Sequence, residues 1–174
     1  MFCDDGIHRQ REEPPSGITM HQFSVPGIHN AKGIADWYRS NQQYTGGQMP
    51  YSIVNPMNGE LELALPWNEV GPHALRWSSP TIGVVSIGDF NKQIPTPQQW
   101  ESAIDIASEL CCAYNLCPSD VAHLSGHTER PFASKTPGKV CPGNFWNMDK
   151  FREHVTDAMR ESAFQRIQKA IQYR

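Results

Sequence analysis

The sequence predicts a single α/β domain in which helices flank a central mixed β-sheet. The chain has 174 residues, enough for one globular domain with its own hydrophobic core. The run Thr81–Ile87 is apolar and β-branched, which is typical of a buried central strand. Short strand-like runs alternate with longer helical patterns, and this order favours one sheet with helices packed on its faces.

The first half of the chain predicts a strand, a helix and a hairpin, in that order. Residues 18–23 form a short β-like run before a proline and a glycine. Residues 32–43 place apolar and aromatic side chains on one helical face. The pair Asn58-Gly59 separates two short apolar runs, residues 50–54 and 60–64, and both residues of the pair tolerate positive φ. We therefore expect a β-hairpin that turns at this pair.

The second half predicts two helices separated by a long loop. Thr96, followed by a proline, has the character of a helix N-cap, and the helical pattern continues to about residue 115. Residues 121–124 are a brief strand candidate. Residues 125–146 are rich in glycine and proline, and a loop of this length is usually functional or disordered. From residue 147 to the last residue the pattern is helical and amphipathic.

Composition and charge exclude several classes of protein. Charged residues make up 19% of the chain and the net charge is −3, unlike a disordered chain or a general nucleic-acid binder. No apolar run approaches the ~20 residues that cross a membrane. Residues 1–15 lack an apolar core, so we expect no secretory signal. The five cysteines make a poor disulfide framework, and we expect Cys111, Cys112 and Cys117 to be buried thiols.

Three residues that lie far apart in the sequence are candidate metal ligands. His21 lies near the end of the first predicted strand, whereas His127 and Cys141 lie in the Gly/Pro-rich loop. Imidazole nitrogen and thiolate suit zinc, and three protein ligands leave a fourth position for water, as in catalytic sites. The spacing fits no local zinc-finger or HExxH pattern, so packing roles for His21 and Cys141 stay open from the residues alone.

Several short motifs follow one another in a fixed order over residues 18–151. They are His21, Tyr51 with Asn58-Gly59-Glu60, Gly71-Pro72-His73-Ala74, Thr81-Ile82-Gly83-Val84, Thr96-Pro97-Gln98-Gln99, Gly126-His127-Thr128-Glu129 and Lys139-Val140-Cys141-Pro142-Gly143. In this order they resemble the type 2 amidases, a family of zinc-dependent N-acetylmuramoyl-L-alanine amidases. That family includes amidase-type phage lysozymes and peptidoglycan recognition proteins. Ordered motifs over most of the chain are far more specific than any one of them.

The resemblance implies a role for each matched residue. It implies that His21, His127 and Cys141 hold Zn²⁺, and that Tyr51 and Lys139 assist catalysis. The chemistry of these side chains agrees, because a phenol can transfer a proton and an ammonium group can stabilise an oxyanion. From the residues alone, Tyr51 can equally be a packing residue and Lys139 an exposed loop charge.

Two further residues of the motifs each have more than one candidate role, and one position departs from the family. The resemblance makes His73 a candidate for substrate contact, with a structural role as the alternative. Glu129 is a candidate partner that orients a zinc ligand, or else a loop cap or an ion-pair partner of Arg130. Gln22 stands where many relatives carry a second histidine or a small residue. Lys135 is a second basic residue in the loop, but Lys139 keeps the family's offset from the cysteine.

The resemblance also implies a domain plan and an activity. We expect a poorly ordered leader at 1–16, an amidase catalytic domain at 17–155, and a helical extension at 156–174 that packs on the domain. The implied reaction is hydrolysis of the amide between the N-acetylmuramic acid lactyl group and L-alanine in bacterial peptidoglycan, by a monomer. Such an enzyme would stay cytoplasmic until released to the wall and would act in the periplasm, either as a phage endolysin or as an antibacterial effector.

The main rival hypothesis is a non-catalytic peptidoglycan-binding module on the same fold. Family members of that kind have typically lost the zinc-binding cysteine, whereas this chain keeps Cys141. A second rival is an enzyme that acts on soluble wall fragments, and those relatives tend to carry aspartate at the position of this cysteine. The residues at the predicted zinc site therefore favour the wall-cleaving branch.

Overall fold

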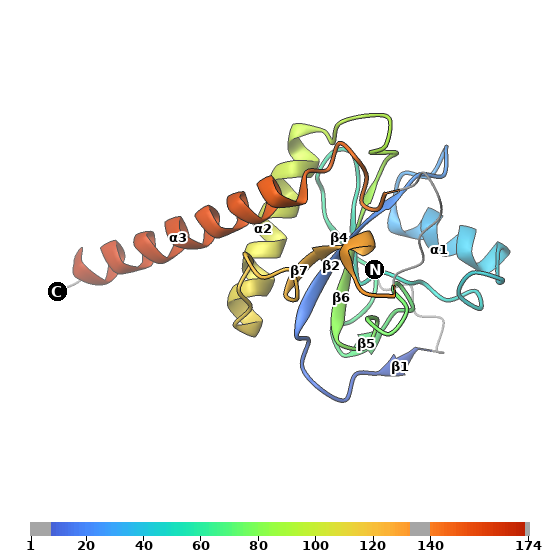
Figure 1. Cartoon of the computed structure of the whole chain (residues 1–174), viewed down its shortest axis with the longest axis horizontal. Coiled ribbons are helices and arrows are strands. Elements are labelled where there is room, and N and C mark those ends of the chain that lie inside the picture. Colours follow the sequence, from blue (N-terminus) through green and yellow to red (C-terminus); the bar gives the residue numbers. More distant parts are fainter. Residues whose placement is uncertain (1–7, 133–139, 173–174) are drawn as a thin grey trace.

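The computed structural model describes residues 8–132 and 140–172, and Figure 1 shows the path of the chain. The elements in chain order are β1 (Arg9–Gln10), β2 (Gly17–Phe23), α1 (Ala31–Ser40), β3 (Ile53–Asn55), β4 (Glu62–Leu63), β5 (Glu69–Val70), β6 (Thr81–Ile87), α2 (Pro97–Tyr114), β7 (Leu124–Gly126), the 3₁₀ turn η1 (His127–Glu129) and α3 (Met148–Gln172). The α/β class with a central mixed sheet is confirmed.

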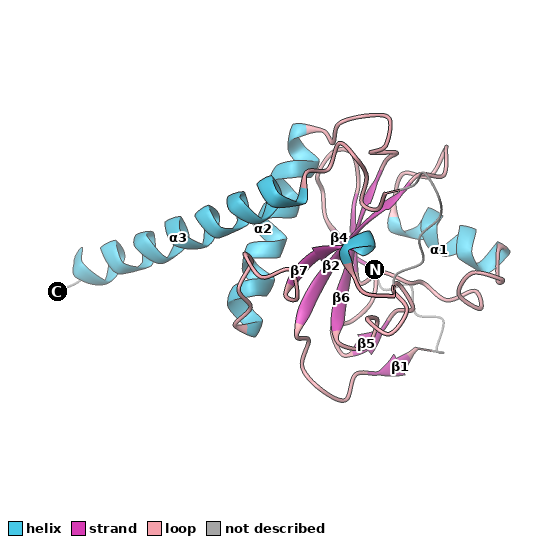
Figure 2. Ribbon diagram, viewed as in Figure 1, coloured by secondary structure: helices cyan, strands magenta, loops and turns pink. Residues whose placement is uncertain are grey.

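The central sheet has the strand order β4-β3-β6-β2-β7. Figure 2 shows its strands between α1 and α2. β3, β6, β2 and β7 run parallel, and β4 pairs antiparallel with β3 to form the predicted hairpin. Because these four strands are parallel, their carboxyl ends lie at one edge of the sheet, the place where open α/β sheets bind ligands. The loops that follow β2, β6 and β7 therefore meet at this edge.

Alternation along the strands divides the core into two layers. On β2, Ile18 and Met20 face α2 and α3, whereas Phe23 faces α1. Helix α1 covers one face of the sheet, and α2 with the first half of α3 covers the other (Figure 1). Because side chains alternate between faces, His21 lies on the α1 face.

Helix α2 begins where the sequence predicts, and its first turn also connects the helix to the sheet. The Thr96 side chain accepts a hydrogen bond from the Gln99 backbone, and the Gln99 side chain reaches back to the Thr96 backbone, which makes a capping box. The buried Gln99 amide donates to the carbonyls of Asn55 and Ile87, at 3.2 and 2.9 Å. These two residues end β3 and β6, so one glutamine fixes the helix against both strands.

The described part of the predicted leader is built into the fold. Within residues 8–16, β1 pairs antiparallel with β5. The Arg11 guanidinium donates to the backbone carbonyls of four residues in the segment that carries His73. Those residues are Trp67, Glu69, Ser79 and Thr81. These backbone partners connect residues 8–16 to the domain, a role that their polar composition does not suggest.

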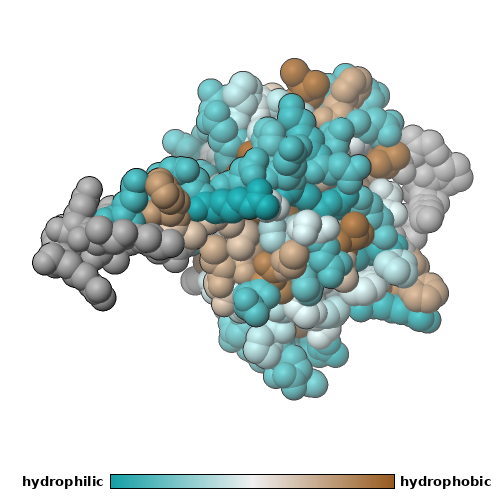
Figure 3. Space-filling model, turned by 60° about the vertical axis from the view of Figure 1, so that its left-hand side comes forward, coloured by the Kyte–Doolittle hydropathy of each residue, from teal (hydrophilic) through white to brown (hydrophobic). Residues whose placement is uncertain are grey.

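The C-terminal region is one helix of 25 residues, without a break near residue 155. The Asn147 side chain accepts a hydrogen bond from the Lys150 backbone and caps its start. Phe151 and Val155 are buried against the α2 side of the sheet, whereas Phe164 is 55% exposed. Figures 1 and 3 show α3 leaving the body of the domain, and hydrophobic residues on the face in Figure 3 are scattered among hydrophilic ones. Among the side chains that the structure describes, those of the first half of the helix pack on the domain.

Two smaller expectations also differ from the structure. The brief strand predicted at residues 121–124 begins only at Leu124, because residues 117–123 form turns. Cys111 is buried as expected, but Cys112 and Cys117 are exposed because they face away from the core. Among the residues that the structure describes, no helix has the length and apolar character needed to span a membrane.

Candidate metal centre

His21, His127 and Cys141 come together at the carboxyl edge of the sheet. One ligand atom from each lies within 4.8 Å of those of the other two. His21 stands near the end of β2 and is 2% exposed, whereas His127 begins η1 directly after β7, and both His127 and Cys141 are half-buried. The Cys141 sulfur lies 3.8 Å from His21 Nδ1. Residues that the sequence separates by more than a hundred positions thus form one compact donor set.

Local geometry explains why the Cys141 segment reaches this position. Its carbonyl accepts hydrogen bonds from the backbone N–H and the hydroxyl of Thr128, both at 3.0 Å. Gly126 makes this approach possible, because a Cβ built there would lie 2.6 Å from Pro142 Cδ. The Gly-His-Thr and Cys-Pro motifs therefore pack directly on each other.

A chain of hydrogen bonds behind His21 fixes which of its nitrogens faces the site. His73 Nε2 lies 3.2 Å from the Thr81 carbonyl oxygen, which can only accept, so this nitrogen carries the proton. His73 Nδ1 then accepts from His21 Nε2 at 3.0 Å. His21 Nδ1 is left with a free lone pair on the side of Cys141. This is the arrangement in which the second nitrogen of a metal-binding histidine is hydrogen-bonded by an outer partner.

The charge states that burial favours agree with this chain of hydrogen bonds. Burial lowers the pKa of His73 from 6.5 to about 3. Burial, with His73 and His127 nearby, lowers the pKa of His21 well below its usual value. Both rings are therefore neutral at pH 7. Burial raises the pKa of the Cys141 thiol to about 12, although the Gln22 backbone N–H favours the thiolate.

The donor set fits a zinc ion. Burial also lowers the pKa of His127, so the donor set offers two neutral imidazoles, those of His21 and His127. Together with a thiol that becomes a thiolate on metal binding, they match the nitrogen and sulfur ligands that zinc prefers. A bound dication is also the charge that would offset the burial of the Cys141 thiolate. Three protein ligands leave one coordination position for water or substrate, which distinguishes catalytic from structural zinc sites.

His73 lies behind the site, in contrast to the predicted substrate contact. It is 9% exposed, and its two ring nitrogens bond to His21 and to the Thr81 backbone. Gly83 of β6 makes the space for its ring, because a Cβ at this position would lie 2.7 Å from His73 Cγ. The segment before β6 turns this ring inward onto the strand, an arrangement that favours the structural role given as the alternative to substrate contact.

Tyr51 lies beside the donor set, just before β3. Its ring centroid is 5.2 Å from that of His21, and it is 6% exposed. Its hydroxyl is 3.2 Å from the hydroxyl of Tyr38 on α1. Burial raises the pKa of Tyr51 well above 10, so this phenol is neutral and can donate a proton or a hydrogen bond.

Glu129 acts on the His127 turn through the backbone. Its carboxylate accepts from the Gly126 N–H at 2.7 Å and closes the η1 turn. Arg152 of α3 holds the same carboxylate with two hydrogen bonds, at 2.9 and 3.0 Å. The predicted loop cap is therefore present, and the ion-pair partner is Arg152. Arg130 instead donates to backbone carbonyls of Ile18 and Ala122 and to the Thr19 hydroxyl.

Two basic residues of the sequence analysis, Lys135 and Lys139, lie outside the described residues. The structure also adds contacts that the sequence analysis did not assign. Tyr38, Thr81 and Arg152 each bond to a predicted site residue. Thr81 opens one of the quoted motifs, but no sequence signal identified Tyr38 or Arg152, since each looks like an ordinary helix residue until its long-range partner is known.

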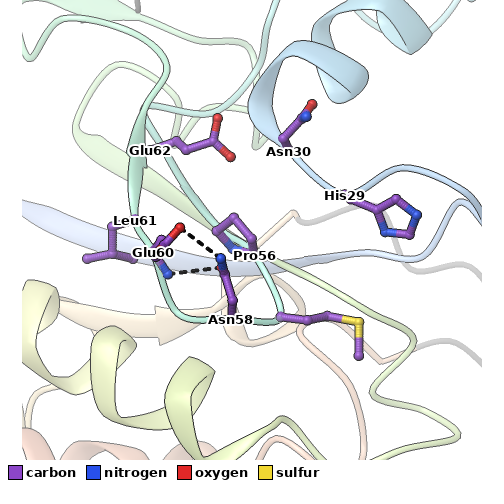
Figure 4. Close-up of a pocket in the computed structure, with 8 residues that line it drawn as sticks. His29, Asn30, Pro56, Asn58, Glu60, Leu61 and Glu62 are labelled. Atoms are coloured by element: carbon purple, nitrogen blue, oxygen red, sulfur yellow. Dashed lines mark hydrogen bonds between the residues drawn. The ribbon is translucent and has the colours of Figure 1, made fainter.

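A groove among the described residues lies away from the donor set. It has a volume of about 620 Å³ and lies between the start of α1 and the β3–β4 hairpin (Figure 4). Its polar groups bond to each other or to backbone, as Asn58 does with Glu60 and Glu62 with the Ala31 N–H. This groove contains none of the predicted site residues. The His21–His127–Cys141 cluster, and not this groove, is therefore the candidate site for a metal ion.

Comparison with known proteins identifies related sequences. Residues 11–144 match the model of the N-acetylmuramoyl-L-alanine amidase family. Peptidoglycan-recognition protein 1 of Holotrichia diomphalia is 24% identical over 144 residues, covering 80% of this chain and 72% of that protein. Peptidoglycan-recognition protein SC2 of Drosophila melanogaster is 26% identical over 98 residues, and this match spans only 49% of that protein.

Solved structures share the fold. The endolysin N-acetylmuramoyl-L-alanine amidase LysCS of Clostridium intestinale URNW superposes with a TM-score of 0.68 at 22% identity, covering 86% of this chain and 92% of that one. The Ph2119 endolysin of a Thermus scotoductus bacteriophage gives a TM-score of 0.69 at 21% identity, covering 87% and 92%. At these identities the likeness shows a common fold.

Proposed function

The chain belongs to the N-acetylmuramoyl-L-alanine amidase family, and from this premise we propose that it is a zinc-dependent peptidoglycan amidase. The proposed reaction is hydrolysis of the amide between the lactyl group of N-acetylmuramic acid and L-alanine. The observation that carries the proposal is the His21–His127–Cys141 cluster, with its ligand atoms within 4.8 Å of one another. A scaffold that only bound peptidoglycan would not need this donor set.

The residues around the cluster prepare it for such a reaction. A zinc ion held there would polarise the amide carbonyl and lower the pKa of a water molecule toward about 7. His73 keeps the His21 ring in one tautomer and one orientation. The His21 and His73 rings remain neutral, so neither of them places an imidazolium charge that would oppose the binding of a dication.

Tyr51 and Lys139 are proposed to act on the substrate. The neutral Tyr51 hydroxyl, oriented by Tyr38, can donate a hydrogen bond to the developing negative charge on the amide oxygen. Lys139 stands two positions before Cys141 in the sequence, and its ammonium group would stabilise the same charge. Lys139→Ala should therefore keep zinc but lose turnover, and full activity in this variant would remove Lys139 from the mechanism.

The non-catalytic binding module remains the second candidate. It is favoured by the names of the curated relatives, which are peptidoglycan-recognition proteins. The presence of Cys141 within the donor set favours the enzyme. The two candidates make opposite predictions about turnover and agree on binding, so turnover is the property to measure.

The test uses N-acetylmuramoyl-L-alanyl-D-isoglutamine as a soluble substrate. Purified protein with one equivalent of zinc should release the dipeptide, detected by liquid chromatography and mass spectrometry. Cys141→Ser is the matched control and should lose both zinc and release while keeping its fold by circular dichroism. If the wild type retains zinc but leaves both this substrate and polymeric peptidoglycan intact, the amidase proposal is wrong and the binding module is favoured.

We also propose bacterial wall lysis as the biological role, as an endolysin or an antibacterial effector acting in the periplasm. The endolysin fold relatives support the first of these. Expression in a Gram-negative host with and without a co-expressed holin tests it, because the endolysin role predicts lysis only when the inner membrane is opened. Lysis without the holin would contradict this role.

A further inference from the structure

Gln22 directly follows the ligand His21, at the position where the chain departs from many relatives. Alternation along β2 turns its side chain to the opposite face from His21. There its amide bridges two loops. Oε1 accepts from the Phe90 N–H at 2.6 Å, and Nε2 donates to the Val140 carbonyl at 3.0 Å. Gln22 thus connects the loop after β6 to the residue immediately before Cys141.

Asn91 holds the same carbonyl from the loop after β6. Its Nδ2 donates to the Val140 oxygen at 3.0 Å, and its Oδ1 accepts from the Asn144 N–H at 3.3 Å. Gly143 allows the two loops to approach, because a Cβ there would lie 2.5 Å from the Phe90 backbone. The Val140 carbonyl therefore has two side-chain donors.

The carbonyl on the other side of the Cys141 Cα is held in a similar way. It accepts two hydrogen bonds from Thr128, the residue directly after His127. Each histidine ligand is thus followed in sequence by a residue that bonds to a peptide carbonyl flanking the cysteine. Two carbonyls with two donors each restrict rotation of the backbone on both sides of Cys141, and hence the direction of its sulfur.

We propose that Gln22 and Asn91 are positioning residues for Cys141, and that their hold on the Val140 carbonyl preorganises the sulfur for metal binding. This inference rests on the proposed zinc site. The two side-chain amides bond to backbone groups and not to the metal ligand atoms, so their action is indirect. The Gln22 backbone N–H, which favours the Cys141 thiolate, is not altered by a side-chain substitution. Because Val140 is 39% exposed, the bonds lie at the protein surface, where their loss should affect the cysteine loop more than global stability.

The test compares the wild type with the double variant Gln22→Glu/Asn91→Asp. Glutamate keeps the acceptor for the Phe90 N–H, and aspartate keeps the acceptor for the Asn144 N–H, but both lose the donor to Val140. Gln93→Ala is the control, since this residue is exposed in the same loop. Zinc affinity is measured by competition with a chromophoric chelator. We expect a loss of about 10- to 100-fold in the double variant, as for other outer-shell changes, and none in the control.

Two further readouts separate this inference from the zinc proposal. In Co²⁺-loaded protein, the thiolate-to-metal charge-transfer band should weaken or shift in the double variant. In metal-free protein, alkylation of Cys141 by iodoacetamide, followed by peptide mass spectrometry, should be faster in the double variant, with a thermal midpoint close to the wild type.

The outcomes are distinguishable. Zinc affinity and alkylation rate equal to the wild type would overturn the positioning role. A wild type that binds no zinc would refute the proposed function, and the alkylation comparison would still test the positioning of Cys141. A thermal midpoint that falls together with zinc affinity would indicate a general structural role and would also overturn the inference.

Discussion

Gly83→Ala tests the packing behind the candidate metal centre. A Cβ at this position would lie 2.7 Å from His73 Cγ and 2.8 Å from His73 Cδ2, closer than carbon atoms approach without a shift. The strand cannot move, because β6 is paired with β2 on one side and with β3 on the other. The His73 ring must therefore move, and with it the hydrogen bond to His21.

The size of the effect follows from the contact. Overpacking of this kind costs about 1–3 kcal/mol of unfolding free energy, equivalent to roughly 2–12 °C in the thermal midpoint for a domain of this size. Because His73 orients His21, we also expect zinc affinity to fall by about 10- to 100-fold. Urea unfolding of the metal-free protein measures the first effect, and chelator competition measures the second.

A double-mutant cycle with His73→Ala identifies the cause. If the clash with the ring is responsible, Gly83→Ala should cost little in protein that already lacks the ring, and the two changes should be non-additive by about 1 kcal/mol or more. Additive costs within about 0.5 kcal/mol would refute the reasoning, because the glycine would then be needed for some other purpose than accommodating His73.

Three other predictions concern the same region. Cys141→Ser should retain less than a tenth of the wild-type zinc by mass spectrometry of metals, and a zinc-loaded, active variant would remove Cys141 from the ligand set. Burial lowers the pKa of His73 to about 3 and also lowers that of His21. As the pH falls, the unfolded chain therefore binds protons on these two histidines before the folded chain does. Unfolding free energy of the metal-free protein should therefore fall as the pH drops from about 6.5 toward 3, by up to about 1.4 kcal/mol per pH unit per histidine; a flat profile would contradict neutral buried rings. Arg152→Met should cost about 1 kcal/mol in urea unfolding, because it removes the charged partner of the Glu129 carboxylate, whose side chain is 31% exposed, whereas no loss would make this ion pair unimportant.

The sequence predicted the elements of the sheet from local patterns, and it singled out the three candidate ligands from the order of the motifs. A β-branched run predicts β6, Asn58-Gly59 predicts the hairpin, and Thr96-Pro97 predicts the start of α2. The donor set followed from ordered family motifs and not from spacing, since the fold brings its members together from distant segments.

The remainder depends on long-range partners that no local pattern shows. Residues 8–16 are polar, but Arg11 finds backbone carbonyls more than fifty positions away. His73 has the same motif position whether it faces substrate or His21, and only the turn before β6 decides between them. Gln22 was noted as a departure, yet its partners, Phe90 and Val140, become neighbours only in the folded chain.

The most direct test of the proposed function is mass spectrometry of the products that the purified protein releases from intact peptidoglycan sacculi, with and without a zinc chelator. The account predicts free peptides with an N-terminal L-alanine, released only without chelator and restored by added zinc. Release of disaccharide-peptides would mean that the protein cuts glycan, and the roles assigned to His21, His127 and Cys141 would be wrong.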